Sequence, residues 1–367
     1  MLSKFKHLFH WSVFLPVFSS IFYFGGFLDD NAVTNIIGAI LLFGSVLAAV
    51  HHAEVVAHKV GEPYGTIILA ICITILEVGL IISFMLSGSE SALTYARDTV
   101  FAAVMLILNG ILGICILVGG VRYREQFFAR SSVTTYLVSL VAILVLTLIL
   151  PNYTSSERGP FYTDAQLAFV SIACLVIYGT FLMVQTVRHR NYFIMENGTT
   201  DDNSNDNDDH EPDPPTLTTT LISLALLILS SFVVIFMAKG LSPVIEGFVK
   251  SMGAPKTLVG VIIASFVLLP EGLAAVRAAR ANQIQTSVNL ALGSALASVG
   301  LTIPVISAVC IIYDMPFILG LDLKSIILLS LSVFIVMISL SRGKTNVLYG
   351  TVLLVNLAAY VFTVIVP

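Results

Sequence analysis

Two glutamates stand alone inside long apolar stretches of the chain. Glu77 is the one charged residue between Ile67 and Phe84, and Glu271 is the one charged residue in the stretch 258–276. If these stretches cross a membrane, each carboxyl group costs on the order of 2.5–3.5 kcal/mol on insertion scales. Carboxyl groups at such depth usually serve ion or proton transport. We therefore take both glutamates as candidate ligands for a cation and for protons.

Oxygen groups at helical spacing from these glutamates are candidates for further ligands. Thr74 lies one turn before Glu77 on the same helical face, and Ser265 precedes Glu271. Pro270, directly before Glu271, removes a backbone hydrogen bond and so frees a carbonyl group. Such carbonyl groups are tolerated in a membrane where they line a cavity, although a simple packing kink would also need only a proline.

The stretch 287–298 is rich in small and polar residues and allows two interpretations. Asn289, Ser294 and Ser298 are additional candidate ligands, or this stretch merely permits close helix packing. Two carboxylates with hydroxyl or amide oxygens suit a hard cation. When the cation leaves, low dielectric and mutual repulsion favour proton uptake, so cation and protons would compete.

A third group of polar residues ends the apolar stretch 35–57. His51, Glu54 and His58 have the spacing i, i+3 and i+7, which puts them on one helical face. They are candidates for a proton relay or gate, since histidine titrates near neutral pH. They are equally well interpreted as polar residues at the membrane interface. Glu54 is not adjacent to His51, so the pattern is not the zinc-protease motif.

Composition assigns the chain to the membrane. Of its 367 residues, 57% are hydrophobic and only 11% are charged, against roughly 25% charged residues in soluble domains. This excludes a soluble enzyme, a disulfide scaffold and a nucleic-acid binder. We predict an all-α polytopic membrane protein with about eleven transmembrane helices and no cofactor. Hydropathy predicts spans at 9–28, 35–57, 64–86, 99–120, 132–150, 165–187, 217–238, 257–276, 287–311, 325–341 and 346–366, with Met315–Leu321 as a re-entrant or interfacial piece.

The two glutamates suggest an internal repeat. Glu77 follows Glu62 by 15 residues, and Glu271 follows Lys256 by 15 residues, but the two helices enter from opposite faces. Five spans before a polar linker and five after it predict two inverted five-helix repeats. We place an extra N-terminal helix at 1–34, the repeats at 35–187 and 217–367, and an acidic, disordered linker at 188–216.

The distribution of Lys and Arg predicts the orientation. With the N-terminus in the cytoplasm, most of the 18 Lys and Arg residues fall on the cytoplasmic side. The positive-inside rule therefore favours a cytoplasmic N-terminus and a cytoplasmic linker.

The motifs around both glutamates resemble those of the calcium:cation antiporter superfamily. The first repeat reads His52-Ala-Glu54 to Gly61-Glu-Pro-Tyr-Gly65, then Ile75-Leu-Glu77. The second repeat reads Pro270-Glu271-Gly272-Leu, then Leu292-Gly293-Ser294-Ala-Leu296. The sequence most resembles bacterial ChaA-type calcium (sodium/potassium)/proton antiporters, including the Gly343-Lys-Thr-Asn-Val stretch.

This resemblance implies alternating access around Glu77 and Glu271 as the cation and proton ligands. It implies export of Ca²⁺, Na⁺ or K⁺ from the cytoplasm in exchange for protons, across a bacterial cytoplasmic (inner) membrane. The Gly-Asn pair that usually precedes each family glutamate is absent, because Thr74 and Leu268 stand three residues before Glu77 and Glu271. Two amide ligands are thus missing, which favours monovalent transport. The alternative function is a passive cation channel without proton coupling.

Overall fold

The computed structural model describes residues 11–28, 31–61, 64–86, 92–156, 159–189, 192–193, 215–251, 253, 255 and 257–366. Within these residues, ten helices are long and apolar enough to cross a membrane, and a shorter apolar helix precedes them. The predicted all-helical fold is therefore confirmed. Most of the predicted acidic linker lies outside the described residues.

The α-helices follow the predicted spans closely. In chain order they are α2 (Trp11–Phe24), α3 (Ala32–Val60), α4 (Tyr64–Met85), α5 (Ala92–Met105), α6 (Leu112–Tyr123), α7 (Arg130–Leu144), α8 (Asp164–Met183), α9 (Leu217–Ser251), α10 (Thr257–Arg280), α11 (Ile284–Ile312), α12 (Leu323–Leu340) and α13 (Val347–Ile365). Wider or tighter turns extend three of these spans: π-helical η1 (Leu106–Ile111), η2 (Val145–Ile149) and η4 (Val184–Arg188), and 3₁₀-helical η3 (Leu150–Tyr153).

Polar caps set several helix starts. The Asn31 side chain accepts a hydrogen bond from the Val33 backbone N–H at 3.1 Å, and Asn346 caps α13 in the same way. Thr163 and Gln166 form a reciprocal capping box at the start of α8. Such caps satisfy backbone N–H groups that the first helical turn leaves without partners.

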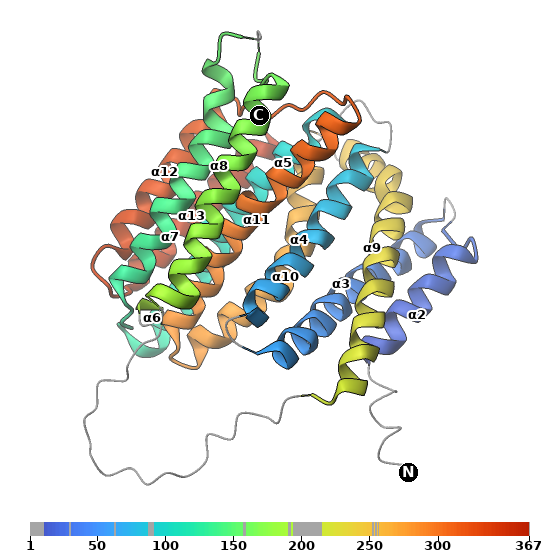
Figure 1. Cartoon of the computed structure of the whole chain (residues 1–367), viewed down its shortest axis with the longest axis horizontal. Helices are drawn as coiled ribbons and strands as arrows, with labels where there is room; N and C mark the ends of the chain where they lie inside the picture. Colours follow the sequence, from blue (N-terminus) through green and yellow to red (C-terminus); the bar gives the residue numbers. More distant parts are fainter. Residues whose placement is uncertain are drawn as a thin grey trace.

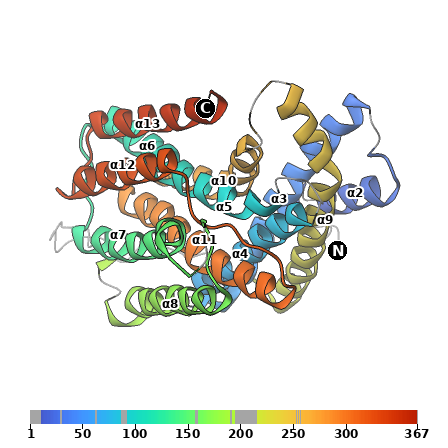
Figure 2. The ribbon, with the colours of Figure 1, turned by 90° about the horizontal axis from the view of Figure 1, so that it is seen from above.

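The helices form three groups across the bundle. Helices α2, α3 and α9 lie together on one side, α6, α7, α8, α12 and α13 lie on the other, and α4, α5, α10 and α11 lie between them (Figure 1 and Figure 2). Helix α2 packs against both α3 and α9. Its Ser19 hydroxyl receives a hydrogen bond from Ser45 of α3 at 2.8 Å. The extra N-terminal helix therefore belongs to the α3–α9 group.

The two halves of the chain are interlocked. Helix α11 of the second half packs on α7 and α8 of the first, while α6 of the first half packs on α13 of the second. Asn109 in η1 marks this second junction. Its amide donates to Ser332 of α12 at 2.9 Å, and Asn356 of α13 donates to its side-chain oxygen at 2.9 Å. Each half thus completes the core of the other.

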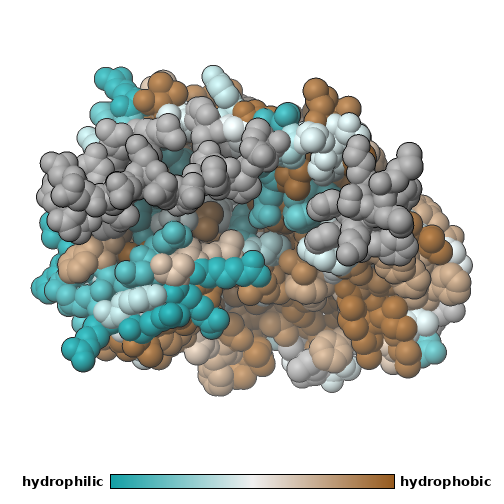
Figure 3. Space-filling view, turned by 90° about the horizontal axis from the view of Figure 1, so that it is seen from below, coloured by the Kyte–Doolittle hydropathy of each residue, from teal (hydrophilic) through white to brown (hydrophobic). Residues whose placement is uncertain are grey.

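The bundle has two ends that differ in their connections. We call the end where η4 terminates and α9 begins the linker end, and the end where α4 terminates and α10 begins the far end; they are the lower and upper ends in Figure 1. At the far end, Met315–Leu321 is extended and bonds to the α7–α8 connection, with Leu321 N–H donating to Leu148 O at 2.9 Å. Seen from the linker end, hydrophilic residues gather on one part of the surface (Figure 3).

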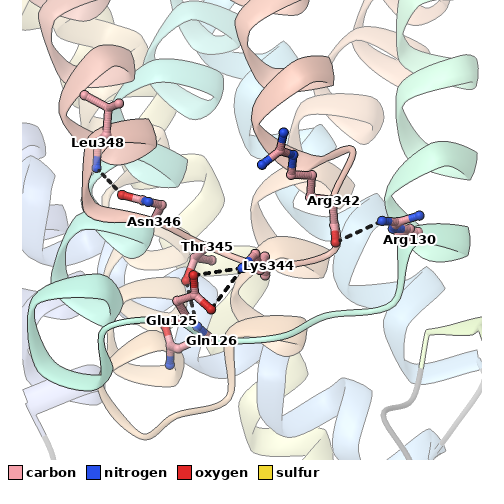
Figure 4. Close-up of polar contacts among 8 residues, drawn as sticks. All are labelled: Glu125, Gln126, Arg130, Arg342, Lys344, Thr345, Asn346 and Leu348. Carbon is pink, nitrogen blue, oxygen red and sulfur yellow. Dashed lines mark hydrogen bonds and ion pairs between the residues drawn. The ribbon is translucent and has the colours of Figure 1, made fainter.

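Two connections are joined at the linker end (Figure 4). Lys344, before α13, bonds both carboxylate oxygens of Glu125, at 2.9 and 3.1 Å. The backbone N–H of Gln126 donates to the Thr345 hydroxyl at 3.0 Å, and Arg130 donates to Arg342 O at 3.3 Å. The Gly343-Lys-Thr-Asn-Val stretch therefore fixes the α6–α7 connection against the α12–α13 connection.

Candidate cation site

Glu77 lies at the middle of α4 and is almost completely enclosed. Its side chain is 5% exposed. Ser298 Oγ donates to Glu77 Oε1 at 2.5 Å, and Thr302 Oγ1 donates to Oε2 at 3.0 Å. Both donors belong to α11, so this helix holds the carboxylate from one side.

Glu271 lies on α10 and is only partly buried. Ser294 Oγ of α11 donates to Glu271 Oε2. Ser294, Ser298 and Thr302 follow one another at four-residue spacing, which puts three hydroxyl groups on one face of α11. This face connects the glutamate of the first repeat to the glutamate of the second.

The two glutamates line one cavity of about 190 Å³. Most of its wall is apolar, which keeps the few polar groups in a low-dielectric setting. The polar residues that line it are Glu54, Thr74, Glu77, Tyr136, Tyr178, Gln185, Glu271, Asn289, Ser294 and Ser298.

The cavity lies on the linker side of the glutamates. It takes Val50 and Glu54 from the last turns of α3, Gln185 from η4, and Asn289 from the first turns of α11. Helix α3 ends at the linker end, as does η4, and α11 begins there (Figure 1). Glu54 is exposed. The cavity therefore extends from the middle of the bundle toward the linker end.

The structure places the predicted neutral ligands at different distances from the site. Ser294 and Ser298 contact the glutamates directly. Thr74 lines the cavity, with its hydroxyl donating to Ala70 O at 2.8 Å. Ser265 is outside the cavity lining and donates to Val261 O at 2.7 Å.

Asn289 lines the cavity, but its amide is engaged elsewhere. Its oxygen accepts from Ser132 at 2.7 Å and from Gln285 at 2.9 Å, while its nitrogen donates to Phe193 O at 2.9 Å. Asn289 therefore fixes α11 against α7 and the end of the first half.

Of the three residues predicted as a relay or gate, the cavity includes one. Glu54 lines it, whereas His51 and His58 are not among the lining residues. The His51 ring lies 5.8 Å from the ring of Trp11 in α2. His58 is exposed near the end of α3.

Sequence reasoning missed Thr302. The signal was present, because Thr302 continues the four-residue spacing of Ser294 and Ser298. It also missed Gln185, which lines the cavity and donates to the hydroxyl of Tyr136 at 3.1 Å.

A comparison with known protein families identifies the family of this chain. Residues 31–187 and 222–366 match the family described as Sodium/calcium exchanger protein. The chain belongs to this family. The two matched segments fall on either side of the linker, and the first contains Glu77 while the second contains Glu271. A member of this exchanger family is a multi-pass membrane transporter rather than an enzyme.

Relatives and solved structures agree with this assignment. The exchanger is 41% identical to y4hA of Sinorhizobium fredii, named only as an ionic transporter, over 97% of this chain and 96% of that protein. It is 32% identical to the sodium-potassium/proton antiporter ChaA of Escherichia coli, over 90% of this chain and 88% of that protein.

The fold is also that of solved exchangers. Native YfkE aligns with a TM-score of 0.72 at 16% identity, covering 97% of this chain and 100% of that one. The H⁺/Ca²⁺ exchanger CAX aligns with a TM-score of 0.68 at 12% identity, covering 96% of this chain and 88% of that one.

Proposed function

We propose that this protein is a secondary-active antiporter that exports Na⁺, Ca²⁺ or K⁺ from the cytoplasm in exchange for protons. The observation that supports this most directly is the shared cavity of Glu77 and Glu271. Two carboxylates in one enclosed space hold a cation when ionised and release it when protonated. Because one state excludes the other, cation and protons must cross the membrane in alternation.

The shape of the cavity favours an antiporter over a passive channel. A channel needs a continuous pore, but the described lining residues come from the middle of the bundle and its linker end. Beyond Glu77, Ser83 of α4 donates to Ile235 O of α9 at 3.1 Å, which holds these helices together. A site open to one end and closed at the other is the arrangement that alternating access requires.

The ligands near the glutamates favour a monovalent cation. Ca²⁺ takes six to eight oxygen ligands. With each carboxylate binding through one oxygen, Glu77, Glu271 and the hydroxyl groups of Ser294 and Ser298 supply four ligands, which falls short of that number without water, and the Asn289 amide is already bonded. We therefore infer that Na⁺ or K⁺ drives faster exchange than Ca²⁺.

We further propose that the linker end faces the cytoplasm of a bacterial cell. Arg122, Arg124, Arg277 and Arg280 are exposed at this end, as the positive-inside rule requires of a cytoplasmic surface. The cavity in this structure would then open toward the cytoplasm.

Proton release from everted membrane vesicles tests the function. Vesicles carrying the protein are energised to an acid interior, and Na⁺, K⁺ and Ca²⁺ are added in turn while a pH-sensitive dye is followed. We expect each transported cation to release protons, Na⁺ or K⁺ faster than Ca²⁺. Glu77→Gln and Glu271→Gln should abolish release, because neither variant can exchange a proton for a cation at that position.

Glu125→Gln is the matched control. It makes the same substitution at the exposed Glu125–Lys344 pair, and release should be unchanged. No release with any cation from inserted protein would reject antiport. Retained release in either cavity variant would remove that glutamate from the mechanism.

A further inference from the structure

Glu54, which lines the cavity at the linker end, has a counterpart in the second repeat. Glu54 lies six residues before the end of α3, and Glu246 lies five before the end of α9, the corresponding helix of the other half. The helices run in opposite directions across the bundle (Figure 1). Glu246 is therefore the far-end equivalent of Glu54.

The two residues differ in their surroundings. Glu54 is exposed beside an open cavity, whereas Glu246 is partly buried and bonded. Tyr95 Oη of α5 donates to Glu246 Oε1 at 2.5 Å, and Ser242 of α9 donates to the same oxygen at 3.3 Å. Tyr95 itself is 1% exposed. A hydrogen bond to a carboxylate from a buried phenol is a strong contact between two helices.

This contact lies on the far-end side of Glu77. The Tyr95 ring meets Phe84 of α4 edge to face, with centroids 5.7 Å apart. Phe84 is two turns beyond Glu77 along α4, about 10 Å at 1.5 Å per residue. Ser83, beside it, is 5% exposed and bonds to α9. The Tyr95–Glu246 bond thus joins α5 to α9 beside the far-end part of α4. Without this bond, water and ions from the far end would have access to that part of α4.

We propose that Tyr95 and Glu246 form the latch that closes the far end of the path, and that Glu246, once released, is the first carboxylate met by inorganic cations arriving from that side. The inference rests on the proposed antiport. It gives each end of the path one acidic residue, Glu54 or Glu246. In the described structure the linker-end residue is open to the cavity and the far-end residue is held by Tyr95.

Cysteine labelling tests the latch without relying on transport. A Met85→Cys reporter at the end of α4, where the side chain is 8% exposed, is placed in a Cys72→Ala background and treated with a membrane-impermeant maleimide in intact cells and in everted vesicles. Tyr95→Phe removes the donated hydrogen bond but keeps the ring. We expect it to raise the labelling rate about tenfold in intact cells, as loss of a hydrogen bond to a charged group allows.

Tyr153→Phe is the control, because Tyr153 is an exposed tyrosine at the far end. Its labelling rate should equal that of the parent. If Tyr95→Phe labels no faster than the parent from either side, the latch is wrong even if antiport is measured. Faster labelling in a protein without proton release would keep the latch and reject the antiport.

A second variant tests the role of the carboxylate. Glu246→Gln should raise the half-saturating concentration of cation added from the far side severalfold, and leave the value for the linker side unchanged. Glu54→Gln should do the reverse. Equal changes on both sides for Glu246→Gln would overturn its assignment to the far end.

Discussion

The helices beyond the two glutamates have equivalent places in the repeat but unequal surroundings. Two residues after Glu77 stands Gly79, where an added Cβ would meet Ile235 Cδ1 of α9 at 2.5 Å. Two residues after Glu271 stands Leu273, which is 43% exposed. The far-end gap between α4 and α9 is therefore closed by direct packing.

The linker-end gap between α10 and α3 remains open. Six residues after Glu77, Ser83 bonds to α9, whereas six residues after Glu271, Arg277 is exposed. Both glutamates line the same cavity, while the residues beyond them are closely packed on the far-end side and exposed on the linker-end side. On the proposed mechanism, closure of the far end would depend on side chains outside the cavity that holds Glu77 and Glu271.

The largest expected effect comes from filling the closed gap. Gly79→Leu would push α4 away from Ile235, and overpacking of this kind costs about 1–3 kcal/mol. We expect a lower midpoint of thermal unfolding and faster maleimide labelling of the Met85→Cys reporter from the far end. Leu273→Val is the matched control at the open gap, and both readouts should stay at parental values. Equal effects of the two substitutions would mean that the far-end and linker-end gaps are packed equally tightly.

An effect on cation binding, rather than on closure of the far end, should follow from removing the α11 hydroxyl groups. Ser294→Ala leaves Glu271 without its α11 donor, whereas Thr302→Val leaves Glu77 with Ser298. A hydrogen bond to a charged group contributes about 1.5–3 kcal/mol. We therefore expect Ser294→Ala to raise the half-saturating cation concentration in everted vesicles about tenfold, and Thr302→Val to raise it less. The reverse order would place the principal cation contact at Glu77.

Glu54→Gln should have a weaker and salt-dependent effect on linker-side binding. An exposed carboxylate at the cavity mouth attracts cations over distances that salt screens, with a Debye length of about 10 Å at 0.1 M. Initial rates of proton release should fall at low ionic strength and approach the parental rate at high ionic strength. A loss that persists at high salt would instead make Glu54 a direct ligand.

The smallest effect is expected at the linker-end connections. Lys344→Gln breaks the exposed pair with Glu125, and such pairs contribute less than about 1 kcal/mol. Exchange rate and reporter labelling should both remain unchanged, because the pair lies outside both gaps. A change in labelling would mean that the linker-end connections also help to keep the far end closed.

Apolar stretches predicted the helices well, but their polar ends were less informative. The span 257–276 began where α10 begins, at Thr257, but ended four residues early, since α10 continues through Arg277 to Arg280. The span 217–238 ended too early, since α9 continues to Ser251. Hydropathy falls at Lys239 although the backbone stays helical, and Glu246 lies in that extension.

The glutamates could be predicted because an isolated charge in an apolar stretch is costly. Their partners could not be assigned in the same way, since a serine or threonine in a helix often bonds its own backbone, as Ser265 and Thr74 do. Which hydroxyl groups face Glu77 depends on how α4 packs against α11. That packing comes from long-range contacts, which spacing within one helix does not show.

The interlocked halves have a consequence for how the protein is made. Asn109 is completely buried, and its partners Ser332 and Asn356 lie 223 and 247 residues further along the chain. When the first half has been inserted, the Asn109 amide nitrogen has Met105 O as a partner at 3.1 Å, but its side-chain oxygen still lacks the donor that Asn356 supplies, and an unsatisfied polar group in lipid is costly. We therefore expect the first half to reach its final packing around Asn109 only after α12 and α13 are inserted. The buried Asn109 network of this exchanger is therefore completed by its last two helices, α12 and α13.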